Sequence, residues 1–380
     1  MGWIEALAAV VLIAVVLVDA FAAMILPRRV SYPYRLAPLF YRYGWLAWRT
    51  AARLFPSGRR RNTFLSVFGP LSMLALFALW AAGLIAGFAL LHWSLDAPLT
   101  VPAGNDRGFD TYLYFSGTTF FTLGYGDIVP TGGAGRTLSV AEAGLGFGFL
   151  AVVISYMPVL YQAFSRREIT ISLLDARAGS PPTAGELLRR VAAAHHPGGC
   201  VSLLAEWERW AAELLESHLS YPVLSYYRSQ HDNQSWVGAL TTVLDTAALL
   251  IASGDGAEGH QARLTFAMAR HAAVDLTLVF STPPPAAADR LPPADLARLW
   301  ESLRGAGVNL RDTEAAAKAL AELRALYEPF VHALAFYFRF PLPPMLPAAS
   351  PVDNWQTSPW MPRSPGLGRL PAGDGDEHFD

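Results

Sequence analysis

Residues 118–127 read Thr-Thr-Phe-Phe-Thr-Leu-Gly-Tyr-Gly-Asp, and this stretch decides the fold. Gly124 and Gly126 stand at alternate positions, where each can take a positive φ at no steric cost. A backbone that changes hand at every second residue turns consecutive carbonyl groups to one side. We therefore expect a row of carbonyl oxygens from Thr122, Leu123, Gly124 and Tyr125, which the hydroxyl of Thr122 extends.

Four such rows around a common axis supply a cage of oxygens that can replace the hydration shell of a potassium ion. The stretch resembles the selectivity-filter signature of the potassium channels, in which K⁺ passes through and is not a resident cofactor. The resemblance implies that the ion is bound by Thr122, Leu123, Gly124, Tyr125 and Gly126. Leu123 stands where the signature usually has Val, but its carbonyl meets the ion and its side chain does not.

The residues before the filter fit the same resemblance. Asp110 can cap a short helix that runs to about Phe121, and such a pore helix points the negative end of its dipole toward the channel centre. Thr118 occupies the position where the family often has a Glu that pairs with the Asp after the filter, here Asp127. Because this acid–acid pair is missing, Tyr114 is the expected partner of Asp127. We predict that the filter is supported by Thr118, Thr119, Asp127 and Tyr114.

Two apolar stretches flank the motif, at about residues 63–91 and 137–164. Each is long enough to cross about 30 Å of hydrocarbon, which takes roughly 20 helical residues. A Gly-Tyr-Gly-Asp in a soluble protein would indicate a turn, whereas its place between two spans favours a filter. The composition agrees, since 53% of the 380 residues are hydrophobic and 16% are charged. Such a balance is typical of a chain partly in membrane and partly in water.

A third apolar stretch runs from about Trp3 to Leu26. Its first residues carry no positive charge, so we interpret it as a transmembrane helix and not as a signal peptide. Residues 27–62 hold many arginines and no acidic residue, which places this segment in the cytoplasm and the N-terminus outside. The filter then lies at the external mouth of a multi-pass protein of the inner (plasma) membrane.

Asp19 lies inside this first span, and we expect it to hydrogen bond with a neighbouring helix rather than to act in transport. After the span, residues 32–55 predict a helix in the headgroup plane, with arginines on lipid phosphates and aromatic rings toward the acyl chains. Its arginines are Arg35, Arg42, Arg49 and Arg53. A voltage sensor needs arginines at every third residue of a spanning helix, so we expect weak voltage dependence.

The last span carries the residues expected to move. Gly144, Gly146 and Gly148 either bend this inner helix to gate the pore or only make room for the pore helix, and the sequence leaves both open. Pro158 offers a second kink. A Gly-Arg-x-Leu-x-x-x-Glu pattern that ends at Glu142 resembles that of bacterial two-span channels. The resemblance implies that Glu142 braces the pore behind the filter.

Beyond Arg167 the composition changes, and helical patterns follow a linker at residues 168–182. We predict an all-α cytoplasmic domain with helices at 184–196, 201–218, 234–252, 261–280, 293–304 and 312–338. No Gly-x-Gly-x-x-Gly follows a strand here, so a Rossmann domain is not expected. The two most apolar patterns carry Asp245 or Asp275 and are interpreted as core helices, not as spans.

The segment 218–236 is rich in side chains that both donate and accept hydrogen bonds. One interpretation is a site for a cytoplasmic ligand or regulator, which would use Tyr227, Arg228 and His231. The other is a helix junction capped by Asp232 or Asn233. The tail is rich in Pro and Gly and is expected not to order itself.

These patterns predict an all-α membrane protein of three transmembrane helices with a re-entrant pore helix and filter, followed by an all-α cytoplasmic domain. The expected parts are an N-terminal span with an interfacial helix at 1–62, a pore domain at 63–165, a regulatory domain at 166–340 and a disordered tail at 341–380. One filter per chain implies a homotetramer.

A potassium-selective channel is the function that the sequence favours. The alternative is a membrane-embedded sensor or scaffold whose helical domain recruits a partner and whose pore is vestigial. An enzyme is not expected, because no nucleophile–base pair, phosphate loop or metal cluster stands out. The net charge of −2 argues against a nucleic-acid partner. The expected partners are other copies of the chain and membrane lipids.

Overall fold

The computed structural model describes residues 2–26, 35–56, 58–101, 108–193, 199–231, 233–253, 257–283, 289–308 and 313–346. Helices make up nearly all of this part of the chain, which confirms the all-α class. It divides into two compact units, the first made of Met1–Pro56 and Thr63–Gln162, the second of Ser57–Asn62 and Ala163–Asp380. The expectations for residues 32–34, for Asp232 and for the tail beyond residue 346 fall outside the described residues.

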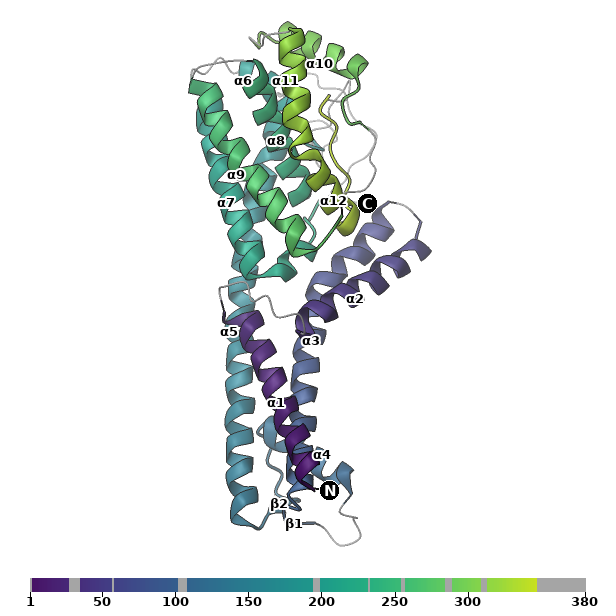
Figure 1. The fold of residues 1–380 in the computed structure, drawn as a ribbon, viewed down its shortest axis with the longest axis vertical. Helices are drawn as coiled ribbons and strands as arrows, with labels where there is room; N and C mark the ends of the chain where they lie inside the picture. The colour runs from purple at the N-terminus through teal and green to yellow at the C-terminus, as the bar shows by residue number, and fades with distance from the viewer. Residues whose placement is uncertain are drawn as a thin grey trace, which may run out of the picture. The chain divides into compact units, whose positions relative to one another are not determined.

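The first unit contains the sequence motif and the helices around it (Figure 1). These are α1 (Gly2–Met24), α2 (Leu36–Ala51), the 3₁₀ turn η1 (Ala52–Leu54), α3 (Arg59–Ser94), α4 (Phe109–Phe120) and α5 (Gly133–Ala178). Two short strands, β1 (Leu99–Thr100) and β2 (Val129–Pro130), pair antiparallel with Leu99 opposite Pro130. This pair was not expected from the sequence, and it ties the loop after α3 to the chain that follows the filter motif.

The helices α1, α3 and α5 are long and apolar enough to cross a membrane, as is α8 (Trp236–Ser253) of the second unit. The expected spans at 63–91 and 137–164 lie inside α3 and α5. Of the apolar window of α8, 89% is buried inside the protein, against 11% for that of α5. The first value agrees with a core helix, whereas α5 presents an apolar surface that its own chain does not cover.

Asp19 joins α1 to the rest of the first unit. Its carboxylate is buried and accepts hydrogen bonds from Nε1 of Trp80 at 2.9 Å and from the backbone N–H of Ala37 at 3.0 Å. The Nε atom of Arg35 lies 3.7 Å from the other carboxylate oxygen. The expected bond to a neighbouring helix is therefore confirmed, and the same carboxylate also fixes where α2 begins.

The helix expected at 32–55 forms as α2, but its rings do not all face outward. Nε1 of Trp48 donates to the carbonyl of Phe64 at 3.0 Å, and the two rings stack at 4.5 Å. Trp45 is buried against Phe68 of α3, with ring centroids 5.0 Å apart. The expectation that the rings point to acyl chains is thus wrong for these two tryptophans, because the long α3 supplies them with aromatic partners.

In the second unit, helices gather around α8 (Figure 1). They are α6 (Ala184–Ala193), α7 (Gly199–Ser220), α9 (Ala257–Val279), α10 (Pro293–Gly305), α11 (Glu314–Ala325) and α12 (Glu328–Phe338), with a 3₁₀ turn η2 (Pro222–Tyr226) after α7. The apolar α8 carries one buried charged residue, Asp245, whose partners compensate for its burial. Its carboxylate accepts hydrogen bonds from Arg290 at 2.5 Å and from the hydroxyl of Tyr327.

Two local expectations are corrected. Residues 168–178 are not a linker, because α5 continues to Ala178 and ends where Gly179 takes φ of +81°, a common helix end. The helix expected at 312–338 breaks between Ala325 and Glu328. Pro329 stands in the first turn after the break, where its missing N–H costs no helical bond.

Replacing Asp19 should loosen α1 from the first unit. Asp19→Ala leaves the indole N–H of Trp80 and the backbone N–H of Ala37 without an acceptor, at roughly 1–3 kcal/mol for each buried group. The purified protein should therefore unfold at a lower temperature than wild type, and Asp19→Asn, which keeps one acceptor oxygen, should lose less. Glu5→Ala is the matched control on the same helix. Wild-type stability in Asp19→Ala would show that the carboxylate is not an anchor.

Candidate ion-conduction site

The backbone of the filter motif alternates in hand. Thr122, Gly124 and Gly126 have φ of +56°, +55° and +78°. The two glycines take this conformation freely, but a β-branched residue in the left-handed region is strained. The sequence predicted positive φ for both glycines and did not predict it for Thr122. The result is the alternation that a row of carbonyls facing one way requires.

The end of α4 holds the entry to this stretch. The carbonyl of Thr118 accepts from the N–H of Leu123 at 2.8 Å and from that of Gly124 at 3.4 Å, while the carbonyl of Thr119 accepts from the N–H of Thr122 at 3.0 Å. The hydroxyl of Thr118 donates to the carbonyl of Phe115 within the helix. Both threonines therefore meet the filter through main-chain oxygens that a helix end leaves unpaired.

The start of α4 differs from the expectation. Gly108, not Asp110, is the cap residue, and no side chain accepts a hydrogen bond there. Asp110 lies inside the first turn, where a carboxylate still interacts favourably with the helix dipole. Farther along α4, the hydroxyl of Tyr114 donates a hydrogen bond to Asp127. Tyr114 and Asp127 therefore pair with each other, as we expected from the sequence.

Glu142 lies behind the pore helix among buried polar groups. Its Oε1 contacts the hydroxyl of Ser116 in α4, and that hydroxyl oxygen lies 2.9 Å from the carbonyl oxygen of Ile85 in α3. Its Oε2 lies 3.4 Å from Nε2 of His92, and both side chains are fully buried. The sequence reading overlooked His92, although an ionisable residue inside an apolar span is a signal of function by itself.

The three glycines of α5 differ in their surroundings. A Cβ atom at Gly146 would lie 2.0 Å from the carbonyl oxygen of Phe120, the last residue of α4, whereas nothing lies within 4 Å of one at Gly144 or Gly148. Gly146 therefore makes room for the pore helix. α5 runs unbroken through Pro158, and the gating role of Gly144, Gly148 and Pro158 remains a prediction.

Large apolar side chains around the filter are exposed in the single chain. Leu123 is 53% and Tyr125 69% exposed, and on α5 Phe147 is 69% and Ile154 70% exposed. Exposed apolar surface of this extent marks a contact with other protein or with lipid. The filter and the inner helix therefore lack, within one chain, the neighbours that would cover them.

The residues predicted for a regulatory site serve the architecture of the second unit. Arg228 donates to the carbonyls of Phe338 at 2.8 Å and Arg339 at 3.1 Å, and its guanidinium lies 4.6 Å from the ring centroid of Phe340. It thus holds the end of α12. The carbonyl of His231 accepts from Gln234, and Ser235 caps α8 by accepting from the N–H of Gly238. The expected cap at Asn233 is therefore wrong.

Arg167 and His218 form a buried pair beside Tyr227. Arg167 donates to the carbonyls of Leu224 and Tyr227, both at 2.9 Å, and contacts Nε2 of His218 at 3.2 Å. Nδ1 of His218 lies 2.8 Å from the carbonyl of Leu214 and must donate to it. Burial, and then the charge of Arg167, holds the pKa of His218 well below 6.5. Burial also raises the pKa of Tyr227 to about 12.

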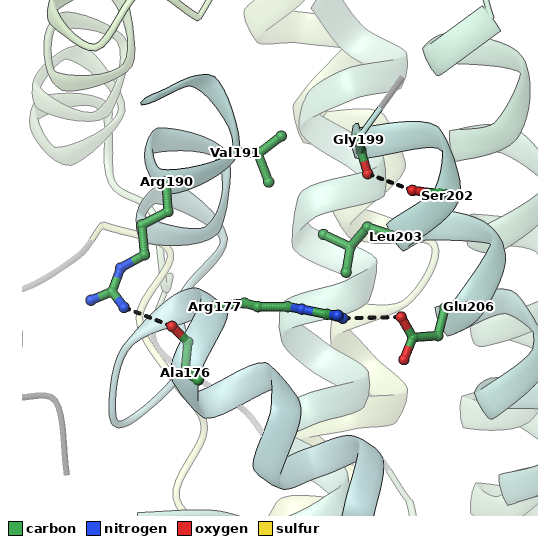
Figure 2. Close-up of a pocket in the computed structure, with 8 residues that line it drawn as sticks. All are labelled: Ala176, Arg177, Arg190, Val191, Gly199, Ser202, Leu203 and Glu206. Atoms are coloured by element: carbon green, nitrogen blue, oxygen red, sulfur yellow. Dashed lines mark hydrogen bonds and ion pairs between the residues drawn. The ribbon is translucent and has the colours of Figure 1, made fainter. Parts of the chain in front are cut away.

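A hollow of ≈ 390 Å³ lies where α6, α7 and the end of α5 meet. Figure 2 shows that its two arginines are engaged: Arg177 pairs with Glu206 at 3.0 Å, and Arg190 donates to the carbonyl of Ala176 at 2.8 Å. Val191 and Leu203 add apolar wall. The hollow shares no residue with the segment 218–236, and the sequence did not point to it.

Comparison with known proteins fits this geometry. Residues 75–162 match a family model described as an ion channel, and this range holds most of α3, all of α4, the filter motif and about the first two thirds of α5. The apolar helices indicate a membrane location. The match supports an ion channel of the pore-loop class.

Three curated proteins are similar to the chain. It is 26% identical over 192 residues to the uncharacterized membrane protein YdjJ of Bacillus subtilis, which covers 50% of this chain and 55% of that protein. It is also 34% identical to protein LctB of Geobacillus stearothermophilus and 32% identical to protein LctB of Bacillus caldotenax. Each of these two matches runs over 85 residues, which are 20% of this chain and 63% of the relative. The chain thus matches less than two thirds of each relative, and no solved structure matches it.

The contact at Gly146 can be tested against a glycine of the same helix. Gly146→Ala forces its new methyl group into the carbonyl of Phe120 and should displace α4, whereas Gly148→Ala meets open space. We expect Gly146→Ala to lower the unfolding temperature clearly and Gly148→Ala to leave it almost unchanged, since clashes in packed regions cost about 1–3 kcal/mol. Equal stability of the two variants would contradict the close approach.

His218 should make the second unit sensitive to acid. Because its pKa is lowered on folding, the unfolded state binds more protons as the pH falls below 6.5, and stability is lost in that direction. The protection of the η2 amides, which is their exchange rate compared with that of the unfolded chain at the same pH, should therefore fall between about pH 7 and about pH 5. His218→Gln should remove this loss of protection, and the exposed His260→Gln should retain it. An unchanged pH profile in His218→Gln would contradict the assignment.

Proposed function

We propose that the protein is a potassium-selective channel whose pore is formed by four copies of the chain. The observation that carries this proposal is the positive φ at Thr122, Gly124 and Gly126. Backbone that alternates hand in a Thr-Leu-Gly-Tyr-Gly sequence lets consecutive carbonyls face one axis, where they can coordinate dehydrated K⁺. The side chain of Leu123 takes no part in coordination, so the substitution of Val by Leu should preserve selectivity.

The oxygen cage needs four filter segments, and each chain supplies one, so the assembly that we propose is a homotetramer. Neighbouring copies would cover the exposed Leu123, Tyr125 and apolar residues of α5. Closed rotational symmetry gives every copy the same environment. The lipid-facing surface would then be formed largely by α1, whose Trp3, Ile4 and Val18 are 87%, 77% and 63% exposed.

We propose that the protein lies in the plasma membrane. Its N-terminus and filter would face the outside of the cell, and residues 166–340 would lie in the cytoplasm. The arginines between α1 and α3 support this orientation. We further propose that the helical domain controls the gate, because α5 runs as one helix from beside the filter to Ala178. A cytoplasmic ligand or regulator of that domain remains a part of the proposal.

Flux in liposomes tests conduction. Wild-type protein should pass K⁺ and discriminate against Na⁺, and Ba²⁺ should block the flux. A well-folded tetramer that passes no ion would instead favour the sensor or scaffold, in which the helical domain recruits a partner. A stable monomer in lipid would rule out the channel as proposed.

The filter glycines give the sharpest test of the backbone argument. Within its own chain a Cβ atom at Gly124 or Gly126 would meet no neighbour within 4 Å, so the strain that alanine adds within the chain comes from φ, at about 1–2 kcal/mol for each chain. Gly124→Ala and Gly126→Ala should abolish K⁺ flux and leave insertion and assembly intact. Gly133→Ala, equally uncrowded but with ordinary φ, should conduct normally. Selective flux in either filter variant would count against the proposal.

A further inference from the structure

Ser116, Glu142 and His92 form a polar cluster behind the pore helix, and the positions of its protons decide which hydrogen bonds it can make. The Ser116 hydroxyl oxygen has two neighbours, the carboxyl group of Glu142 and the carbonyl oxygen of Ile85. A serine hydroxyl carries a single proton and can donate only one hydrogen bond. If Ser116 donates to Ile85, which can only accept, the contact with Glu142 is a hydrogen bond only when the carboxyl group carries a proton and donates it.

His92 faces the other oxygen of the same carboxyl group. Its Nε2 lies 3.4 Å from Oε2 of Glu142, and neither ring nitrogen has a hydrogen-bond partner in the structure. The ring also meets Phe115 of the pore helix edge-on, with centroids 5.2 Å apart. Because both side chains are fully buried, an unpaired net charge on the pair would be costly. A proton on the carboxyl group of Glu142 beside a neutral His92 ring leaves both buried side chains uncharged.

Other ionisable groups of the surrounding helices are paired elsewhere or exposed. On α4, Tyr112 donates to the carbonyl of Ala97, and Tyr114 bonds to Asp127. Arg136 of α5 donates to the carbonyl of Pro130. The remaining groups are the exposed Asp96 and Asp110 and the half-buried Glu5 of α1. Among the described residues, no other charged group pairs with Glu142 or His92 to compensate for the loss of the proton.

We propose that Ser116, Glu142 and His92 form a proton-dependent brace of the pore helix. With a proton on Oε1, Glu142 donates to Ser116 and Ser116 donates to the carbonyl of Ile85, so α5, α4 and α3 are linked in one chain of hydrogen bonds. When the proton leaves, Ser116 must turn its hydroxyl toward the carboxylate, and the link from α4 to α3 is lost. His92 faces the other oxygen of the carboxyl group, Oε2, and does not touch the ion.

The brace acts on the filter through α4. Ser116 lies one helical turn before Thr119 and Phe120, whose carbonyls meet the filter N–H of Thr122 and the backbone of Gly146. Loss of the link to α3 therefore frees the helix that holds the filter entry. Insofar as it concerns conduction, this inference rests on the proposed channel function, and we expect K⁺ flux to fall as the pH rises.

Glu142→Gln is the decisive variant. A glutamine amide donates to Ser116 as the protonated carboxyl group does, but it cannot lose a proton. Wild-type flux should fall roughly fivefold or more across the alkaline transition, a size usual for coupled sites, while Glu142→Gln should stay at the high, acid-side value at every pH. Glu5→Gln should behave as wild type.

Stability gives a readout that does not require conduction. Loss of the proton breaks the link from α4 to α3, so the unfolding temperature of the wild-type protein in lipid should fall as the pH rises, and that of Glu142→Gln should not. Absence of flux at every pH would contradict the channel function, while the stability profiles would still decide the brace. An alkaline loss of stability as large in Glu142→Gln as in wild type would overturn it, as would a pH-independent wild type.

Discussion

In the channel that we propose, carbonyl oxygens can face a common axis only if the filter backbone alternates in hand, and contacts of the first unit hold that backbone. Two of the three positive φ values fall on glycines, but the third falls on Thr122. A β-branched residue keeps that conformation only where its surroundings hold it. The carbonyls of Thr118 and Thr119 supply part of that hold, because they bind the N–H groups of residues 122–124. The strained filter thus depends on a correctly placed end of α4.

Placement of α4 in turn depends on contacts with α3 and α5, since a helix of 12 residues is too short to cross the membrane by itself. Gly146 lets the end of α4 approach α5 closely, and Ser116 makes polar contacts with both neighbouring helices. Tyr112 bonds to the carbonyl of Ala97 just after α3. Polar groups buried between these helices are shielded from water, so each contact also prevents a costly unpaired group.

Much of this arrangement could be read from the sequence, and the failures have physical reasons. The filter glycines and the spans were predictable because their signals are local: a conformational need at fixed positions and a run of apolar residues. His92 was overlooked because its partner Glu142 lies 50 positions away in the numbering, and a lone histidine has no period. The break before Glu328 follows from tertiary structure, since Tyr327 turns its hydroxyl to Asp245 of α8. The tryptophans of α2 likewise found partners on α3 that a lone amphipathic helix would not have.

The continuity of α5 limits how a gate could work. A helix of 46 residues is roughly 70 Å long, and this one carries Glu142 of the brace near one end and Arg167, bonded within the second unit, near the other. Gly146 is held against Phe120, so a bend there would displace the pore helix and the filter with it. The uncrowded Gly148 and Pro158, which lacks an N–H to donate, lie beyond that contact. In the proposed channel, a bend of α5 that opens the inner mouth without disturbing the filter would therefore fall at or after Gly148.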